Sequence, residues 1–197
     1  MSILESASTI LTVNIDAIRH NYRLLCHKLE KDAKCAAAVK ANAYGLGMKK
    51  IVSALNFEFA FGQHSGVIDQ TKNYLELPRF PINEKYGELK RFKSILQTLP
   101  FPYLEITPEN RYLKKDDNPP EVKIKFFDNL INIKNINCYS NEGNVWRKSD
   151  ISFINKNEIM ILLKEKFKSE RGRINCSLWE EGGKWRWLGI QYVIAEY

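Results

Sequence analysis

"AAAVKANAYGLG", residues 36–47, is an apolar run that ends on Lys40 and then breaks into a glycine-containing turn. A strand that is apolar on both faces is typical of a parallel sheet covered by helices. In β/α barrels the carboxyl ends of the strands and the loops after them form the open, catalytic face. The stretch therefore predicts a β/α arrangement in which Lys40 lies at the functional end of a strand.

The segments around this stretch favour the same arrangement. Residues 8–15 form a β-branched, apolar segment that predicts a strand, and Asp16 is placed to cap a helix over residues 16–32. We expect the second strand at residues 34–41 and the second helix at residues 45–55. The order is strand, helix, strand, helix.

The alternation continues as far as residue 102. Three phenylalanines at alternate positions predict a strand over residues 57–61, followed by a weak helix at residues 67–75. Residues 75–83 contain two prolines and fit an edge strand, and residues 86–99 show the apolar spacing of a helix. Residues 1–102 thus predict a partial β/α barrel of about four βα units, roughly half of the usual eight. Its open edges favour self-association.

The pattern changes in residues 103–197. Short segments rich in β-branched and aromatic residues alternate with turns, which predicts a small, mainly antiparallel β region. Residues 155–170 are the one helical candidate in this part. The predicted fold class is therefore α/β, with one domain at residues 1–102 and a mainly β region at residues 103–197.

Composition narrows the classes of function and partner. The formal net charge of the 197-residue chain is +7, but its basic residues are spread among acids, and no nucleic-acid motif accompanies them. We therefore expect no nucleic-acid partner. Neither a basic leader nor an apolar run of bilayer length is visible, so we expect no membrane association and a cytoplasmic location. The four cysteines show no paired metal spacing and predict reduced, mostly buried thiols.

Residues 9–55 resemble the amino-terminal portion of the alanine racemase family. The resemblance rests on "VNIDAIRHNYRLL" followed by "AAVKANAYGLG". It implies that Lys40 matches the catalytic lysine to which the family's cofactor, pyridoxal 5'-phosphate, is bonded. It also implies that Tyr44 matches the tyrosine close to the cofactor phosphate. The family's remaining barrel strands and its carboxy-terminal β domain, with the opposite-face tyrosine, cannot be assigned in this chain. The resemblance thus implies a truncated racemase-like protein with weak or no racemase activity.

Residues 57–194 resemble the carboxy-terminal half of bacterial polysaccharide deacetylases. The resemblance rests on "FAFGQHSGVID", "NINCYSNEGNVWRKSDISF" and "ERGRINCSLWEEGGKWRWLGIQYVI". The metal site of that family belongs to its front half, and the histidine spacing in this chain does not rebuild it, so we expect no metal. This resemblance implies a carbohydrate-binding or accessory module without hydrolysis. A third interpretation is a fusion with no selected activity, and the expected ligand is an amino acid or a glycan.

Three further groups of residues are weaker candidates. His64 and Ser65 follow a predicted strand, where a polar turn is the alternative to a reactive pair. Arg79 could reach an anionic ligand or pack on Phe80. The aromatic residues near the carboxyl end could stack on sugar rings or pack across strands; these are Trp179, Trp185, Trp187 and Tyr192.

Overall fold

A computed structural model describes residues 12–37, 48–70, 72–127 and 132–194. The chain divides into two compact units, Met1–Ala60 and Phe61–Tyr197, which we call the amino-terminal and the carboxy-terminal unit. The division lies near the predicted change of resemblance at residues 55–57. The predicted boundary at residue 102 stays a prediction.

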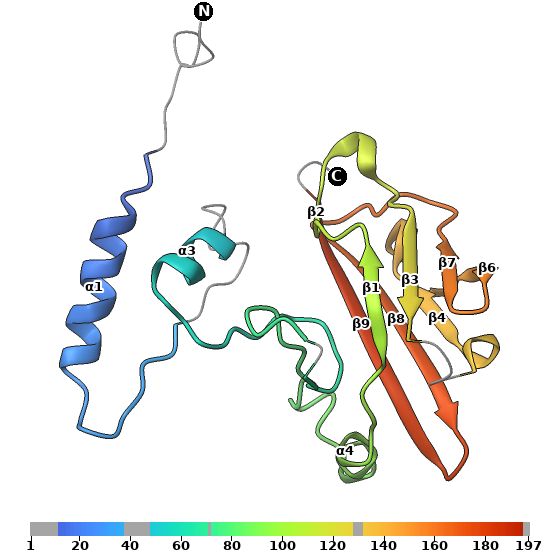
Figure 1. Ribbon diagram of the computed structural model, residues 1–197, viewed down its shortest axis with the longest axis horizontal. Coiled ribbons are helices and arrows are strands. Elements are labelled where there is room, and N and C mark those ends of the chain that lie inside the picture. The colour runs from blue at the N-terminus through green and yellow to red at the C-terminus, as the bar shows by residue number, and fades with distance from the viewer. Residues whose placement is uncertain (1–11, 38–47, 71, 128–131, 195–197) are drawn as a thin grey trace, which may run out of the picture. The chain divides into compact units, whose positions relative to one another are not determined.

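The amino-terminal unit contains two described helices, α1 (Ile15–His27) and α3 (Met48–Ala54) (Figure 1). Asn14 caps α1, because its side chain accepts a hydrogen bond of 2.9 Å from the backbone N–H of Ala17. The predicted cap, Asp16, lies instead in the first turn and pairs with Arg19 at 2.5 Å. Both helices were predicted, and α1 begins one residue before the predicted start.

The strands predicted for the partial barrel do not appear as regular strands in the described residues. Among the described residues up to residue 100 the structure contains isolated bridges and no longer strand. One of these bridges joins Phe61 to Leu77 in parallel, and it is all that forms of the strands predicted at residues 57–61 and 75–83. The first two predicted strands lie half outside the described residues, and their described halves, residues 12–15 and 34–37, form no strand. The partial barrel as a whole stays a prediction. The weak helix predicted at residues 67–75 is wrong, because its described residues form coil and turns. The helix predicted at residues 86–99 is confirmed in its centre as α4 (Leu89–Leu96).

The carboxy-terminal unit contains two sheets (Figure 1). The first, in spatial order, consists of β1 (Tyr103–Thr107), β3 (Val122–Phe126), β7 (Glu158–Leu162) and β6 (Asp150–Asn155). The second consists of β2 (Tyr112–Leu113), β9 (Lys184–Ile194), β8 (Arg171–Glu180), β4 (Asn137–Ser140) and β5 (Arg147–Lys148). Short 3-10 turns lie at Lys115–Asp117, Ile133–Asn135 and Glu142–Asn144.

One buried apolar cluster joins the two sheets. Ile124 and Ile159 from the first sheet belong to the same cluster as Ile174 and Ile190 from the second. The sheets therefore form a two-layer sandwich, in which alternate residues of each strand face the core. Every strand pairing except that of β2 with β9 is antiparallel, as the sequence predicted for this part of the chain.

The helix predicted at residues 155–170 is wrong. Residues 158–162 form the central strand β7, in which Ile159 and Ile161 are buried and their neighbours are less so. Burial at every second position is the period of a strand. The run of apolar residues there is too short to separate helix from strand by pattern alone.

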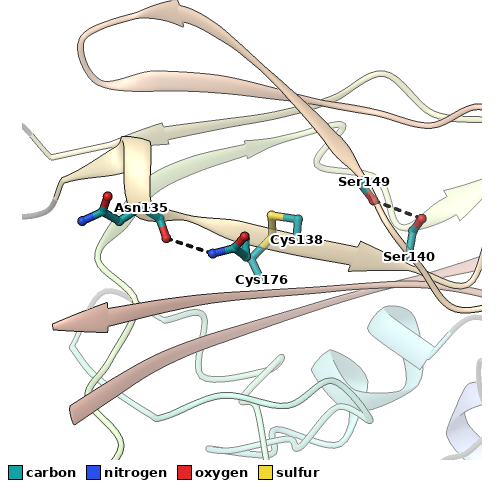
Figure 2. The surroundings of a disulfide bond; sticks show 6 residues. Asn135, Cys138, Ser140, Ser149 and Cys176 are labelled. Carbon is teal, nitrogen blue, oxygen red and sulfur yellow. Dashed lines mark hydrogen bonds between the residues drawn. A yellow bond between two sulfur atoms is a disulfide. The ribbon is translucent and has the colours of Figure 1, made fainter. Parts of the chain in front are cut away.

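Two of the four cysteines form a disulfide, which corrects the expectation of reduced thiols. Cys138 of β4 lies directly opposite Cys176 of β8, and the two are bonded (Figure 2). Both are fully buried in the core. The sequence could not reveal this pair, because the two cysteines are 38 residues apart and only the strand register brings them together. Cys26 and Cys35 are free.

Short segments from three parts of the chain complete the outer edge of β9. β8 pairs with one side of β9, and on the other side β2 pairs with its last residues. Gly66 bridges Leu188, and Leu99 bridges Arg186. Without these segments, the hairpin of β8 and β9 would leave the outer edge of β9 unpaired. With them, much of this edge is covered.

Candidate functional site

The two residues of the predicted cofactor site, Lys40 and Tyr44, lie outside the described residues. The segments on either side of them are described. Arg19 of α1 donates from Nε to the backbone oxygen of Ala54 at 3.0 Å, which ties α1 to the end of α3. The Tyr22 ring packs on Phe57 with 5.0 Å between centroids. These contacts join the helices that precede and follow the lysine segment.

The carboxy-terminal unit contains a cavity of about 50 Å³ beside β1 and the edge of β9. Its polar lining was not predicted from the sequence and includes Lys72, Glu76 and Arg111. Lys72 is buried, and its Nζ lies 3.3 Å from the Asp69 carboxylate and 3.2 Å from the backbone oxygen of Phe101. That ammonium also lies 3.8 Å from the centre of the Tyr103 ring.

Arg111 is the second cation of this cavity. Its Nε lies 4.0 Å from the Glu76 carboxylate, and its guanidinium stands over the Tyr192 ring at 5.6 Å. Burial raises the pKa of Tyr192 to about 12, and Arg111 opposes that rise. Because Asp69 and Glu76 face the two cations, the charges described in this cavity balance.

His64 lines the same cavity, but it does not form a reactive pair with Ser65. Burial, together with Arg111 and Lys72, lowers the pKa of His64 to about 4, so the ring is neutral at pH 7. The backbone oxygen of Ser65 accepts a hydrogen bond of 2.6 Å from Gly189, which fixes this segment on β9. The alternative interpretation, a polar turn, describes the pair.

Arg79 stabilises the same turn. Its Nε donates to the backbone oxygen of Gly62 at 2.9 Å, and its backbone N–H donates to His64 at 3.0 Å. Phe80 packs on Trp187, with 5.5 Å between the ring centroids.

The four aromatic residues near the carboxyl end do not form one surface. Tyr192 is fully buried in the core, and Trp187 is half-buried against Phe80. Trp179 and Trp185 lie opposite each other on β8 and β9, and their rings meet edge to face at 4.7 Å. They are 50% and 38% exposed, so of these four residues Trp179 and Trp185 are the two that present aromatic surface to solvent.

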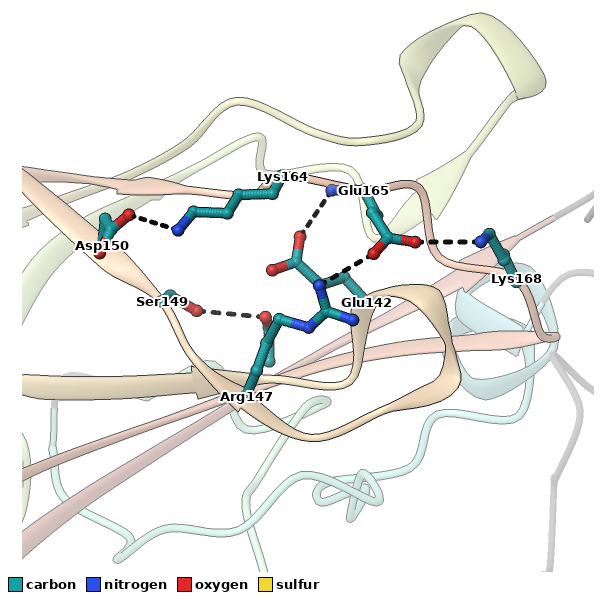
Figure 3. Close-up of polar contacts among 8 residues, drawn as sticks. Glu142, Arg147, Ser149, Asp150, Lys164, Glu165 and Lys168 are labelled. Atoms are coloured by element: carbon teal, nitrogen blue, oxygen red, sulfur yellow. Dashed lines mark hydrogen bonds and ion pairs between the residues drawn. The ribbon is translucent and has the colours of Figure 1, made fainter.

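A charged cluster beside β5 connects two loops through hydrogen bonds and ion pairs (Figure 3). The buried Glu142 accepts the backbone N–H of Glu165 at 2.9 Å. Glu165 pairs with Lys168 at 3.0 Å and with Arg147 at 2.9 Å, and these two partners lower its pKa. The cluster joins the loop after β7 to the turn after β4.

Metal-binding and membrane-spanning features are both missing from the part of the chain that the structure describes. No three of its His, Cys, Asp and Glu side chains gather as a metal site would require. None of its helices has the length and apolar character needed to cross a bilayer.

Comparison with known proteins places the similarity at the amino-terminal end. The family model "Alanine racemase, N-terminal domain" matches residues 13–62, a range that contains Lys40 and Tyr44. The chain is 42% identical over 73 residues to an alanine racemase of Rhodospirillum rubrum, covering 37% of this chain and 19% of that protein. It is 49% identical over 53 residues to a catabolic alanine racemase of Mesorhizobium japonicum, covering 27% of this chain and 14% of that protein.

The chain thus spans less than a fifth of the length of these relatives. No solved structure matches the chain. The amino-terminal segment is alanine-racemase-like, and the second resemblance, to polysaccharide deacetylases, stays a prediction.

Proposed function

We propose that the amino-terminal segment binds pyridoxal 5'-phosphate, with Lys40 as the residue that bonds to the cofactor and Tyr44 beside its phosphate. The observation that carries this proposal is the family match over residues 13–62, which includes the whole "VKANAYG" motif. When bound, the cofactor supplies an electron sink for chemistry at the α-carbon of an amino acid. The chain's own contribution is the Lys40 amine, which can hold or move a proton there.

Racemisation by this chain is expected to be weak or absent. Exchange of the proton on both faces of a substrate needs a second base, and the chain matches these racemases over less than a fifth of their length. The segment that follows residue 61 belongs to a unit of antiparallel sheets. We therefore propose cofactor binding and assign no catalytic reaction to the chain. Only the resemblance indicates that the substrate class is an amino acid.

Cofactor binding by Lys40 can be tested without measuring activity. The full chain is mixed with pyridoxal 5'-phosphate, reduced with borohydride, digested and mapped by mass spectrometry. We expect the reduced adduct on Lys40, together with a Schiff-base absorbance band that Lys40→Ala removes.

Lys34→Ala is the matched control, because Lys34 is an exposed lysine six residues before Lys40 and lies outside the motif. The control variant should retain both the band and the adduct. Adducts spread evenly over exposed lysines, with no enrichment at Lys40, would refute the proposal.

A second candidate function is carbohydrate binding by the carboxy-terminal unit. The observation that favours it is the exposed pair Trp179 and Trp185, since an aromatic face can stack on the apolar face of a sugar ring. This proposal corresponds to the accessory-module interpretation of the deacetylase resemblance and involves no hydrolysis.

Calorimetric titration with acetylated glycans tests this second candidate. Trp185→Ala should lower the affinity about tenfold, the effect of losing roughly 1.4 kcal/mol of contact energy. Phe153→Ala is the matched control, because Phe153 is a similarly exposed aromatic residue on β6 of the other sheet. An absence of binding by the unaltered chain across the glycan series would remove the candidate.

The third interpretation, a fusion with no selected activity, makes a genetic prediction. The DNA that flanks the coding sequence would then contain the remainder of a racemase or of a deacetylase frame.

A further inference from the structure

Two free cysteines of the amino-terminal unit belong to one small cluster. Cys26 lies in the last turn of α1, four residues after Tyr22 and therefore on the same side of the helix. The hydroxyl of Tyr22 donates to the backbone oxygen of Cys35 at 3.3 Å, which holds residue 35 against this side of α1. Both cysteines are half-buried and free.

The electrostatics of the three side chains show that they interact. Burial raises the pKa of Cys35, and a hydrogen bond with the Cys26 side chain raises it further. Burial likewise raises the pKa of Tyr22, with a contribution from its hydrogen bond to Cys26. Together with the hydrogen bond of 3.3 Å from Tyr22 to Cys35, these interactions place both cysteines on the same side of α1, although nine residues separate them in the sequence.

We propose that Cys26 and Cys35 form an oxidisable dithiol that closes into a disulfide in the presence of a low-molecular-weight disulfide such as oxidised glutathione. One thiol, as its thiolate, attacks a glutathione sulfur and releases one glutathione thiol. The other protein thiol then attacks the protein-bound sulfur, forms the Cys26–Cys35 bond and releases the second glutathione. Two protein thiols are oxidised, and one glutathione disulfide is reduced to two thiols.

Closure of this bond would join the end of α1 to the segment that leads to Lys40. Cys35 precedes Lys40 by five residues, so the cross-link would fix the chain just before the proposed cofactor lysine. The dithiol itself does not depend on cofactor binding, because its geometry comes from α1 and residue 35 alone.

The test uses the full chain, in which Cys138 and Cys176 are already bonded. Free thiols are counted before and after incubation with oxidised glutathione, and the peptides are mapped by mass spectrometry. We expect two reactive thiols to fall to none, with a cross-linked peptide that joins Cys26 to Cys35. Tenfold dilution of the protein should leave the extent of closure unchanged, because the second step occurs within one chain.

Cys26→Ser is the matched variant, since it leaves Cys35 without a resolving thiol. Its mixed disulfide with glutathione should persist at least tenfold longer than that of the unaltered chain. An unchanged thiol count, a persistent glutathione adduct on the unaltered chain, or cross-links between chains would each overturn the proposal. The mapping of the unaltered chain decides the question even where the variant fails to fold.

Discussion

His64 makes the stability of the carboxy-terminal unit depend on pH. The pKa of His64 is about 4 in the folded state, against 6.5 for an unperturbed histidine. Between these values the unfolded chain binds a proton that the folded chain does not bind, so the free energy of unfolding decreases as the pH falls. This stabilisation is complete at pH values well above 6.5, where the histidine is neutral in the unfolded chain as well. Its loss on acidification amounts to roughly 3 kcal/mol.

His64→Gln should therefore flatten the loss of stability between pH 7 and pH 4.5. Urea unfolding followed by tryptophan fluorescence measures this, because all four tryptophans lie in the carboxy-terminal unit. His20→Gln, at an exposed position of α1, serves as the control and should leave the pH dependence as it is. Equal pH dependence in the unaltered chain and the His64→Gln variant would contradict the assignment.

At single residues, the sequence reveals a contiguous motif more readily than it reveals a residue's surroundings, and the roles of Lys40 and Tyr44 stay predictions. Lys40 and Tyr44 were recognisable because one contiguous motif contains them. Lys72 and Arg111 were not, because their environment comes from segments that are distant in the sequence, including β1 and β9. The aromatic residues of β9 looked alike in the sequence, whereas strand alternation buries Tyr192 and exposes Trp185.

Gly189 illustrates how one element of the sandwich depends on another. A Cβ at this position would lie 2.5 Å from the backbone nitrogen and 2.7 Å from the backbone oxygen of Ser65. Both are main-chain atoms, so the segment that covers the edge of β9 would have to move away.

Gly189→Ala should lower the free energy of unfolding by about 1–3 kcal/mol, the usual cost of overpacking. The measurement is urea unfolding followed by tryptophan fluorescence. Ser177→Ala, on the neighbouring strand β8, is the control and should cost clearly less. A Gly189→Ala variant as stable as the control would show that the contact with Ser65 is not required.

Among the elements, long amphipathic patterns were predicted well and short apolar runs were not. α1 and α4 have an apolar stripe over two or more turns, which is specific to a helix. β7 has only five residues, which is too short for the pattern of apolar residues to distinguish a strand from a helix. Its two-residue period follows from its pairing with β3 and β6 on either side.

At the scale of the whole molecule, the chain combines a racemase-like beginning with a β-sandwich. The family match ends at residue 62, and the compact units divide between Ala60 and Phe61. The sequence predicted a change of resemblance at residues 55–57, whereas the similarity to the alanine racemase of Rhodospirillum rubrum covers 73 residues of the chain and so extends past this point. The sequence could not predict that residues 61–100 belong with the sheets, because this membership depends on bridges and hydrogen bonds to β9 and on no local pattern.

The covered edge of β9 has a consequence for how this chain can be divided. In the hairpin formed by β8 and β9, the outer edge of β9 pairs with Gly66 and Leu99. Both residues precede β1, the first strand of the sandwich. A recombinant fragment that starts at Tyr103 would expose unpaired peptide groups and invite intermolecular pairing. The transferable module of this protein therefore starts at Phe61, some forty residues before its first strand.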